Sequence, residues 1–117
     1  MALTTVQDYV DRARVLLLDQ VEPYRYPTDD LVEALNMGML EVRRLRPELV
    51  KTFFGGEIPD YSASNMTATV AMDQQYRVSF VYYICGHAQL RDDEVNQDSR
   101  AAIFLNKFTS QMLSIQA

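Results

Sequence analysis

Apolar residues recur at helical spacing in four segments of the chain, and the first two segments lie in its N-terminal half. The first predicted helix begins at Thr4 or Thr5, because Thr4 and Gln7 match a capping box that satisfies two free backbone N–H groups. Two prolines end this helix and make residues 22–27 a stiff connector. The second helix begins at Thr28, the expected N-cap, and ends at Pro47.

The other two predicted helices lie in the C-terminal half. The third runs from Asp73, an expected N-cap, to about Arg91, and a charged break follows it. The fourth runs from about Asp98 to Ser114. Its apolar stripe predicts a buried face, with Arg100 and Lys107 facing away from that stripe.

Two positions in these helices predict close packing. Gly38 stands in the middle of the second helix, where it costs about 1 kcal/mol relative to alanine. Close approach of another part of the chain, or of a second subunit, would offset that cost. Residues 78–84 are apolar on nearly every face except at Ser79, so the third helix is expected to be central or covered by a partner.

The segment between the second and third helices has a different pattern. Gly55, Gly56 and Pro59 break any helix there, and residues 66–72 alternate apolar and polar in the period of a β-strand. A lone strand needs a hairpin partner, for which residues 57–61 are available, or a neighbouring subunit. The prediction is therefore a mainly α chain: a small four-helix bundle with a long central loop that contains a short β-strand or hairpin.

Composition narrows the class of protein. The 117 residues suit one helical domain, 1–117, with a loop or β insertion at about 53–72. A net charge of −5 argues against a general nucleic-acid binder. The single cysteine cannot form an internal disulfide, which fits synthesis in a reducing cytoplasm. The longest apolar stretch is about half of what a membrane span needs, so a soluble protein without a membrane partner is expected.

Candidate catalytic and metal-binding groups do not combine into a recognisable site. Cys85 and His87 are two residues apart, which on a helix places them about 200° apart on different faces. With one histidine, a two-histidine metal motif is impossible within one chain. Acidic residues at 29–33 are explained by helix capping, and those at 92–94 by a solvated turn. We expect neither an enzyme nor a bound metal or cofactor.

The remaining candidates are interaction residues. Three arginines close the second helix, where they complement the helix dipole or form a patch for an acidic partner or a phosphate. Loop tyrosines are also candidates, since tyrosine combines apolar area with a polar tip. The expected partner interface comprises Tyr24, Tyr26, Arg43, Arg44, Arg46, Phe53, Phe54, Tyr61, Met66 and Val70.

The order of several short patterns resembles the head-to-tail adaptor, or head-completion, proteins of tailed bacteriophages. Residues 6–50 resemble the opening of that family, through Leu17-Leu18-Asp19 at the end of a helix, a connector with Tyr and Pro, Leu35-Asn36, and Arg46-Pro47. The C-terminal half is similar through Tyr82-Tyr83, Ala88, Arg91-Asp92, Arg100-Ala101-Ala102 and Phe108. Residues 52–72 fall outside the resemblance, because family members carry a different insertion there.

The resemblance implies a structural virion protein at the junction of capsid and tail, made in the host cytoplasm. Members form rings, usually dodecamers, below the portal protein and support the tail or stopper protein. Double-stranded DNA passes through such a ring without specific binding, and a net negative chain would not retain its phosphates. We expect the free protein to be monomeric, with residues 55–71 sensitive to proteases. The alternative is a small helical DNA-binding or regulatory protein that uses the patch from Arg43 to Arg46.

Overall fold

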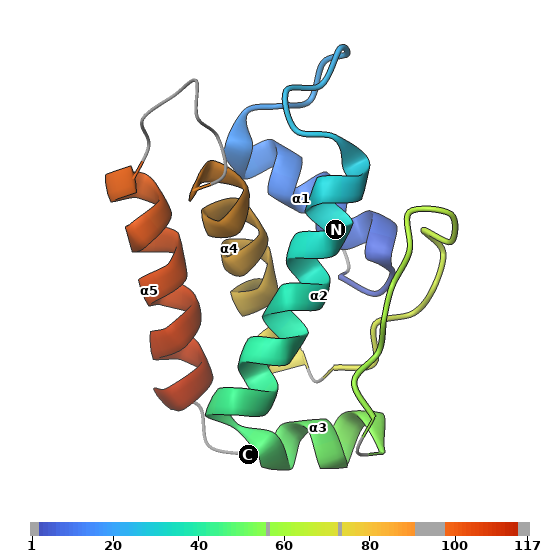
Figure 1. Ribbon diagram of the computed structural model, residues 1–117, viewed down its shortest axis with the longest axis vertical. Coiled ribbons are helices and arrows are strands. Elements are labelled where there is room, and N and C mark those ends of the chain that lie inside the picture. The colour runs from blue at the N-terminus through green and yellow to red at the C-terminus, as the bar shows by residue number, and fades with distance from the viewer. Residues whose placement is uncertain (1–2, 56, 73, 91–97, 115–117) are drawn as a thin grey trace.

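A computed structural model describes residues 3–55, 57–72, 74–90 and 98–114, and all side chains within them except those of residues 53, 74, 98, 99 and 114 (Figure 1). The described chain is mainly helical, as predicted. Its five helices are α1 (Val6–Leu17), α2 (Thr28–Leu45), α3 (Pro47–Phe54), α4 (Gln74–Leu90) and α5 (Asp98–Ser114). The predicted count of four differs because Pro47 ends α2 and also starts α3, in the first turn of which its missing N–H costs nothing. Gly55 closes α3 in the left-handed conformation, with φ 68°.

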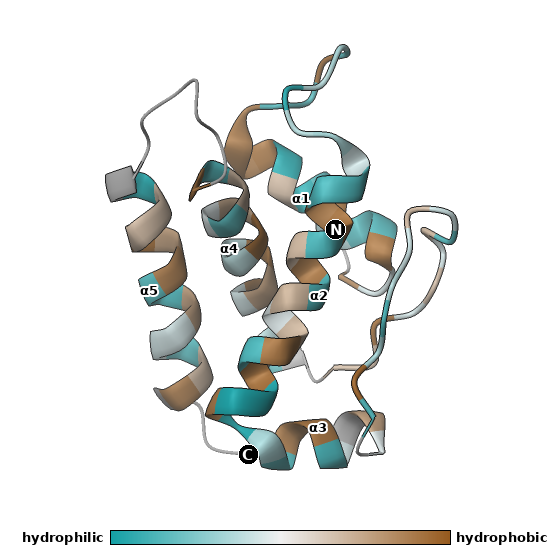
Figure 2. Cartoon of the chain, viewed as in Figure 1, coloured by the Kyte–Doolittle hydropathy of each residue, from teal (hydrophilic) through white to brown (hydrophobic). Residues whose placement is uncertain are grey.

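Helix α4 is the centre of the bundle, which confirms the expectation from its apolar composition. It packs against α1, α2 and α5 (Figure 1). Gly38 of α2 meets it closely: a Cβ at this position would lie 3.1 Å from the Tyr83 ring and 3.4 Å from the Phe80 ring. Gly86 lets α5 approach in the same way, opposite Leu105. The glycine in α2 is therefore explained by packing inside the chain. Figure 2 shows that hydrophobic and hydrophilic residues alternate along α2.

Two predicted helix caps were wrong in detail. The capping box at α1 is formed by Thr5 and Asp8, one residue later than the expected Thr4 and Gln7. Thr28 is the first residue of α2, and the N-cap is Pro27, which makes no side-chain cap. The Thr28 hydroxyl instead accepts a hydrogen bond from Arg14 at 3.0 Å. The predicted N-cap Asp73 of α4 lies outside the described residues.

The position of Arg100 was also predicted wrongly. Its guanidinium turns toward α1 and donates a hydrogen bond of 2.7 Å to the Leu16 carbonyl, in the last turn of that helix. The carbonyl groups at a helix C-terminus have no partner within the helix, so a cation there satisfies one of them and also complements the dipole. Lys107, by contrast, is exposed as expected.

The central segment keeps the predicted period of two, although the described residues contain no assigned strand. Residues 66–72 alternate between side chains turned toward the core and side chains turned outward. Their partner is the chain's own N-terminus: Thr69 forms an isolated antiparallel bridge with Thr5, and the Val70 N–H donates to the Thr4 carbonyl at 2.8 Å. The Val6 N–H donates to the Ala68 carbonyl at 3.0 Å. This pairing replaces the expected hairpin with residues 57–61 and the expected neighbouring subunit.

Candidate functional site

The guanidinium of Arg14 lies at the base of the connector between α1 and α2, closed off from solvent. It donates to the Asp19 carboxylate at 2.9 Å, to the Tyr26 carbonyl at 2.9 Å and to the Thr28 hydroxyl at 3.0 Å. The Asp19 carboxylate accepts from the backbone N–H groups of Arg25 at 2.8 Å and Tyr26 at 3.0 Å. Arg14 is 5% exposed and Asp19 is 7% exposed. This buried pair fixes the path of the connector, because losing one partner would leave a buried polar group unsatisfied.

The connector, residues 18–27, presents large apolar side chains to solvent. It projects from one end of the bundle (Figure 1), and in it Leu18 is 82% exposed and Val21 is 81% exposed. Leu18 ends α1 in the left-handed conformation, with φ 57°. The Tyr24 ring lies 3.8 Å from the Arg14 guanidinium carbon, in a cation–π contact. An apolar tip on a fixed base is suited to docking, because little conformational entropy remains to be lost when a partner binds.

The two connector tyrosines have different surroundings. Tyr24 is 39% exposed and can contact a partner, whereas Tyr26 is 9% exposed and belongs to the core cluster. Tyr26, which was predicted as an interface residue, is thus buried in this chain, where its backbone anchors the Arg14 and Asp19 pair. Sequence reasoning also missed Leu18 and Val21. For Val21 the available signal was Pro23 two residues later, because a proline ends the helix and leaves an apolar residue before it outside the helical stripe.

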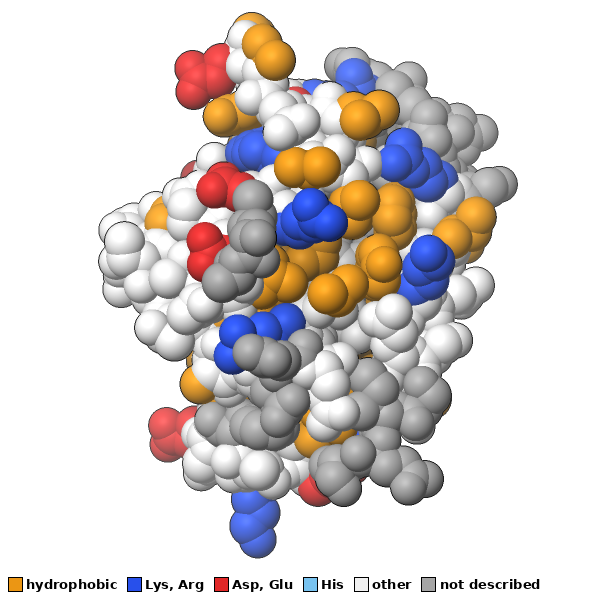
Figure 3. Space-filling view, turned by 180° about the vertical axis from the view of Figure 1, so that it is seen from behind, with side chains coloured by type: hydrophobic (Ala, Val, Ile, Leu, Met, Phe, Trp, Pro, Cys, Tyr) orange, Lys and Arg blue, Asp and Glu red, His pale blue; other side chains and the backbone are white. Residues whose placement is uncertain are grey.

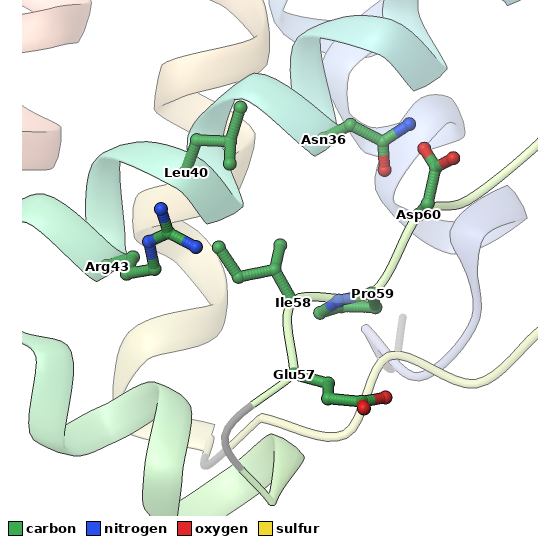
Figure 4. A pocket seen from close by; sticks show the side chains of 7 residues that line it. All are labelled: Asn36, Leu40, Arg43, Glu57, Ile58, Pro59 and Asp60. Carbon is green, nitrogen blue, oxygen red and sulfur yellow. The ribbon is translucent and has the colours of Figure 1, made fainter.

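The arginines at the end of α2 do not form one continuous patch. Arg44 is paired with Glu41 at 2.9 Å on the surface, and this carboxylate raises the pKa of Arg44. Arg46 is paired with Glu48 and donates to the Met112 carbonyl at 2.8 Å, so it also joins α3 to α5. The Arg46 guanidinium holds the pKa of Glu48 below its ordinary value. Arg43 is exposed and points into a separate groove (Figure 4).

That groove lies between α2 and the segment that follows α3, and its volume is about 550 Å³. It is lined by Asn36, Leu40, Arg43, Glu57, Ile58, Pro59 and Asp60. Figure 4 shows Arg43, Leu40 and Ile58 turned toward one another across it. One guanidinium, an apolar wall and two carboxylates suit a mixed surface of another protein. A phosphate would meet two like charges there.

The predicted interface residues of the central segment mostly face inward. Phe54, Tyr61 and Met66 are half-buried against the core, and Val70 is buried in it. Burial raises the pKa of the Tyr61 phenol to about 12. Val70, which was predicted as a partner contact, thus packs inside this chain. The period of two placed it on one face of the segment, and the core of the same chain covers that face. The Phe53 side chain lies outside the described residues.

A surface with aromatic and cationic side chains, also missed in the sequence, lies along α4 and α5. Tyr82 stacks on Phe104 with ring centroids 6.1 Å apart. The Lys107 ammonium lies 5.1 Å from the Tyr82 ring centre, and the Arg100 guanidinium lies 5.4 Å from that of Phe104. Val78 and Lys107 are exposed, Tyr82 and Arg100 are half-buried, and the Phe104 ring is buried beneath the Tyr82 ring that stacks on it. We call these five residues the rear surface. The spacing of 100, 104 and 107 on one helix face was a signal for it.

The candidate reactive groups are held apart. Cys85 is a buried free thiol whose Sγ lies 3.6 Å from the Ala13 carbonyl, and burial raises its pKa to about 12. His87 instead stacks on Tyr83, with ring centroids 5.9 Å apart. In the part of the chain that the structure describes, no three His, Cys, Asp or Glu side chains are placed to hold a metal ion. None of the described helices combines the length and apolar character needed to cross a bilayer.

Comparisons with the profiles of known protein families, with curated proteins and with solved structures gave no match. The most specific features of the described surface are the fixed connector with its exposed apolar residues, the mixed groove on α2, and the rear surface. All three are candidates for contact with another macromolecule.

Proposed function

We propose that this chain is a structural adaptor that forms a ring below the portal and connects the capsid to the tail. It acts by binding alone, and DNA passes through the ring without specific contacts. The resemblance of the sequence to head-to-tail adaptor proteins supports this role, and the mainly helical fold agrees with what that resemblance implies. The location would be the virion, at the junction of capsid and tail.

One observation carries the proposal furthest: Leu18 and Val21 are exposed on a connector whose base is fixed by the buried Arg14 and Asp19 pair. Large apolar side chains on a rigid projection are typical of elements that insert into a pocket of a partner. The connector is the proposed contact with the portal protein. The mixed groove around Arg43 would be available for a second protein contact.

The DNA-binding alternative has less support. Of its three arginines, Arg44 and Arg46 each have a carboxylate partner, and Arg43 lies in a groove with Glu57 and Asp60. A DNA-binding surface needs cations that release counterions from phosphates, and neutralised arginines contribute little to that. A mobility-shift assay over a salt series tests this alternative. Strong binding that falls steeply with salt would favour it over the adaptor.

The adaptor is tested by co-expressing the chain with the portal protein of the same genome and examining the assemblies by electron microscopy. Rings of this protein seated on portal rings are the expected result. Val21→Asp should abolish seating, because it places a charge on the connector tip. Leu113→Asp is the matched control, since Leu113 is also exposed but belongs to the last turn of α5, and that end of α5 lies at the opposite end of the bundle from the connector (Figure 1). Portal rings that remain bare with the unmodified chain would refute the proposal.

A further inference from the structure

The charged residues of α2 before Arg43 are all acidic. From residue 26 to residue 42 the sequence has four carboxylates and no lysine or arginine. Asp29, Glu33, Met37 and Leu40 follow one another at intervals of four, four and three, and all are exposed. They therefore form one line on the outside of the helix. We call these four residues the front stripe. It presents carboxylates at one end and apolar side chains at the other.

The rear surface has the opposite charge. No Asp or Glu occurs from residue 75 to residue 90 or from residue 100 to residue 113. Phe80 and Tyr83 face Gly38 of α2, so Val78 is on the far side of α4 from α2, and Tyr82 turns the same way. Figure 3, seen from behind, shows hydrophobic side chains gathered at the centre of this face, with Lys and Arg side chains among them. The described side chains of Asp and Glu lie toward its edge.

The two faces therefore complement each other in charge and also share an apolar component. They cannot meet within one chain, because α2 runs across the front of the bundle in Figure 1 and the rear surface is seen from the other side in Figure 3. We propose that the front stripe of one copy docks on the rear surface of a second copy of this chain. The carboxylates of Asp29 and Glu33 would lie near Arg100 and Lys107, and Met37 and Leu40 would cover Val78 and Tyr82.

Such a contact joins two different faces, so it is heterologous. Each bound copy still has one free face of each kind, and the assembly grows until it closes into a ring or continues as a filament. This inference deepens the proposed function, because it names the surfaces that would join neighbouring subunits of the ring. Exposed charge pairs add little affinity but set the orientation of the two partners. The free contact is weak, and portal docking would supply the template that completes the ring.

The test uses two double variants of the full chain. The front variant is Glu33→Lys with Met37→Lys, and the rear variant is Val78→Glu with Lys107→Glu. Sedimentation equilibrium is measured up to about 1 mM protein, where a contact with a dissociation constant of that order is half formed. The unmodified chain should exceed the mass of a dimer as concentration rises. Each variant alone should associate about tenfold more weakly or not at all, and a 1:1 mixture should stop at the heterodimer.

Lys51→Glu is the matched control, because it reverses a charge at an exposed position outside both faces. It should associate as the unmodified chain does, and circular dichroism should show that every variant is folded. An unmodified chain that stays monomeric over the whole series would overturn the inference. So would a front variant that still dimerises alone, or a mixture that does not pair.

The portal assay separates this inference from the proposed function. If both double variants form complete rings on the portal, the adaptor role stands and the front-to-rear contact is refuted. If the mixture pairs as expected but the unmodified chain leaves the portal bare, the contact stands and the adaptor role fails.

Discussion

The side-chain amide of Asn36 on α2 forms two hydrogen bonds with the backbone of Tyr61. Its Nδ2 donates to the Tyr61 carbonyl at 2.9 Å, and its Oδ1 accepts from the Tyr61 N–H at 2.8 Å. The amide thus takes the place of a neighbouring strand, because it offers one donor and one acceptor in the spacing of a backbone partner. It attaches the segment after α3 to the bundle.

Asn36→Ala should detach this segment. Both Tyr61 backbone groups would lose their partner in a half-buried setting, so the free energy of unfolding should fall by about 1–2 kcal/mol. Amide hydrogen exchange at Tyr61 should accelerate, and limited proteolysis should gain a cut within residues 57–61. Asn65→Ala is the control, since the Asn65 side chain accepts only from the exposed Thr67 hydroxyl, at 3.1 Å. Unchanged exchange at Tyr61 in Asn36→Ala would argue against the anchoring role.

Burial and hydrogen bonding of the segment after α3 also narrow the expected protease sensitivity of residues 55–71. Val70 and Met72 are buried, and residues 66–70 are hydrogen-bonded to the N-terminal segment. We therefore expect cleavage within residues 57–72 to be confined to the exposed turn at residues 62–65. The sequence could not predict this protection, because the pairing joins segments about sixty residues apart and periodicity reports only local structure.

Helices were predictable where pattern and end signals agreed. α2 begins and ends within a few residues of its prediction, and α4 is central as its apolar composition required. The N-cap of α1 was predicted one residue too early because Thr4 and Thr5 are adjacent candidates. In the structure Thr5 is the N-cap and forms the capping box with Asp8. The fixed connector was not predictable. In a sequence, an arginine within a helix indicates a solvent-exposed face. The burial of Arg14 depends on the turn after α1, which places Asp19 beside it.

Asp19→Ala should be strongly destabilising. It removes the acceptor of Arg14 and of two backbone N–H groups in a buried site, so a loss of about 3–5 kcal/mol in the free energy of unfolding is expected. Glu41→Ala removes the surface partner of Arg44 and should change the free energy of unfolding far less, because solvent screens exposed ion pairs. Urea denaturation of both variants measures the difference. Equal losses would mean that the Arg14 and Asp19 pair does not fix the connector.

Two glycine variants test the close helix approaches. Gly86→Ala would place a Cβ 2.7 Å from Leu105 Cγ and 3.1 Å from the Ala101 carbonyl oxygen. The carbonyl oxygen belongs to the backbone, so it can move away only if α5 shifts. A loss of about 1–3 kcal/mol is expected. In Gly38→Ala the added Cβ would lie 3.1 Å from the half-buried Tyr83 ring. The gain in helix propensity, about 1 kcal/mol, offsets the strain of this contact. Denaturation should therefore rank Gly86→Ala well below Gly38→Ala, and the reverse order would contradict this packing.

The Asp8 cap should make stability depend on pH in acid. Backbone N–H groups of Thr5 and Thr4 donate to the Asp8 carboxylate and lower its pKa from 3.8. A carboxyl whose pKa is lower in the folded state stabilises the protein above the unfolded value, and this contribution is lost as pH falls below about 3.8. Unfolding free energy should therefore fall more steeply below that pH in the unmodified chain than in Asp8→Asn. Asp11→Asn removes the same charge from the same helix without touching the cap and should keep the steep dependence.

Cys85 should be inert in the folded protein. Its thiol is fully buried, and burial raises its pKa to about 12, so at pH 8 only about one thiol in ten thousand would be ionised. A thiol reagent such as a maleimide should label it only as fast as the chain unfolds, and labelling should become complete in denaturant. Leu18→Cys supplies an exposed thiol in the same chain as an internal standard, and mass spectrometry of peptides reports both sites. Rapid labelling of Cys85 under native conditions would show that α1 separates from α4 far more readily than the packing of Ala13 against this thiol implies.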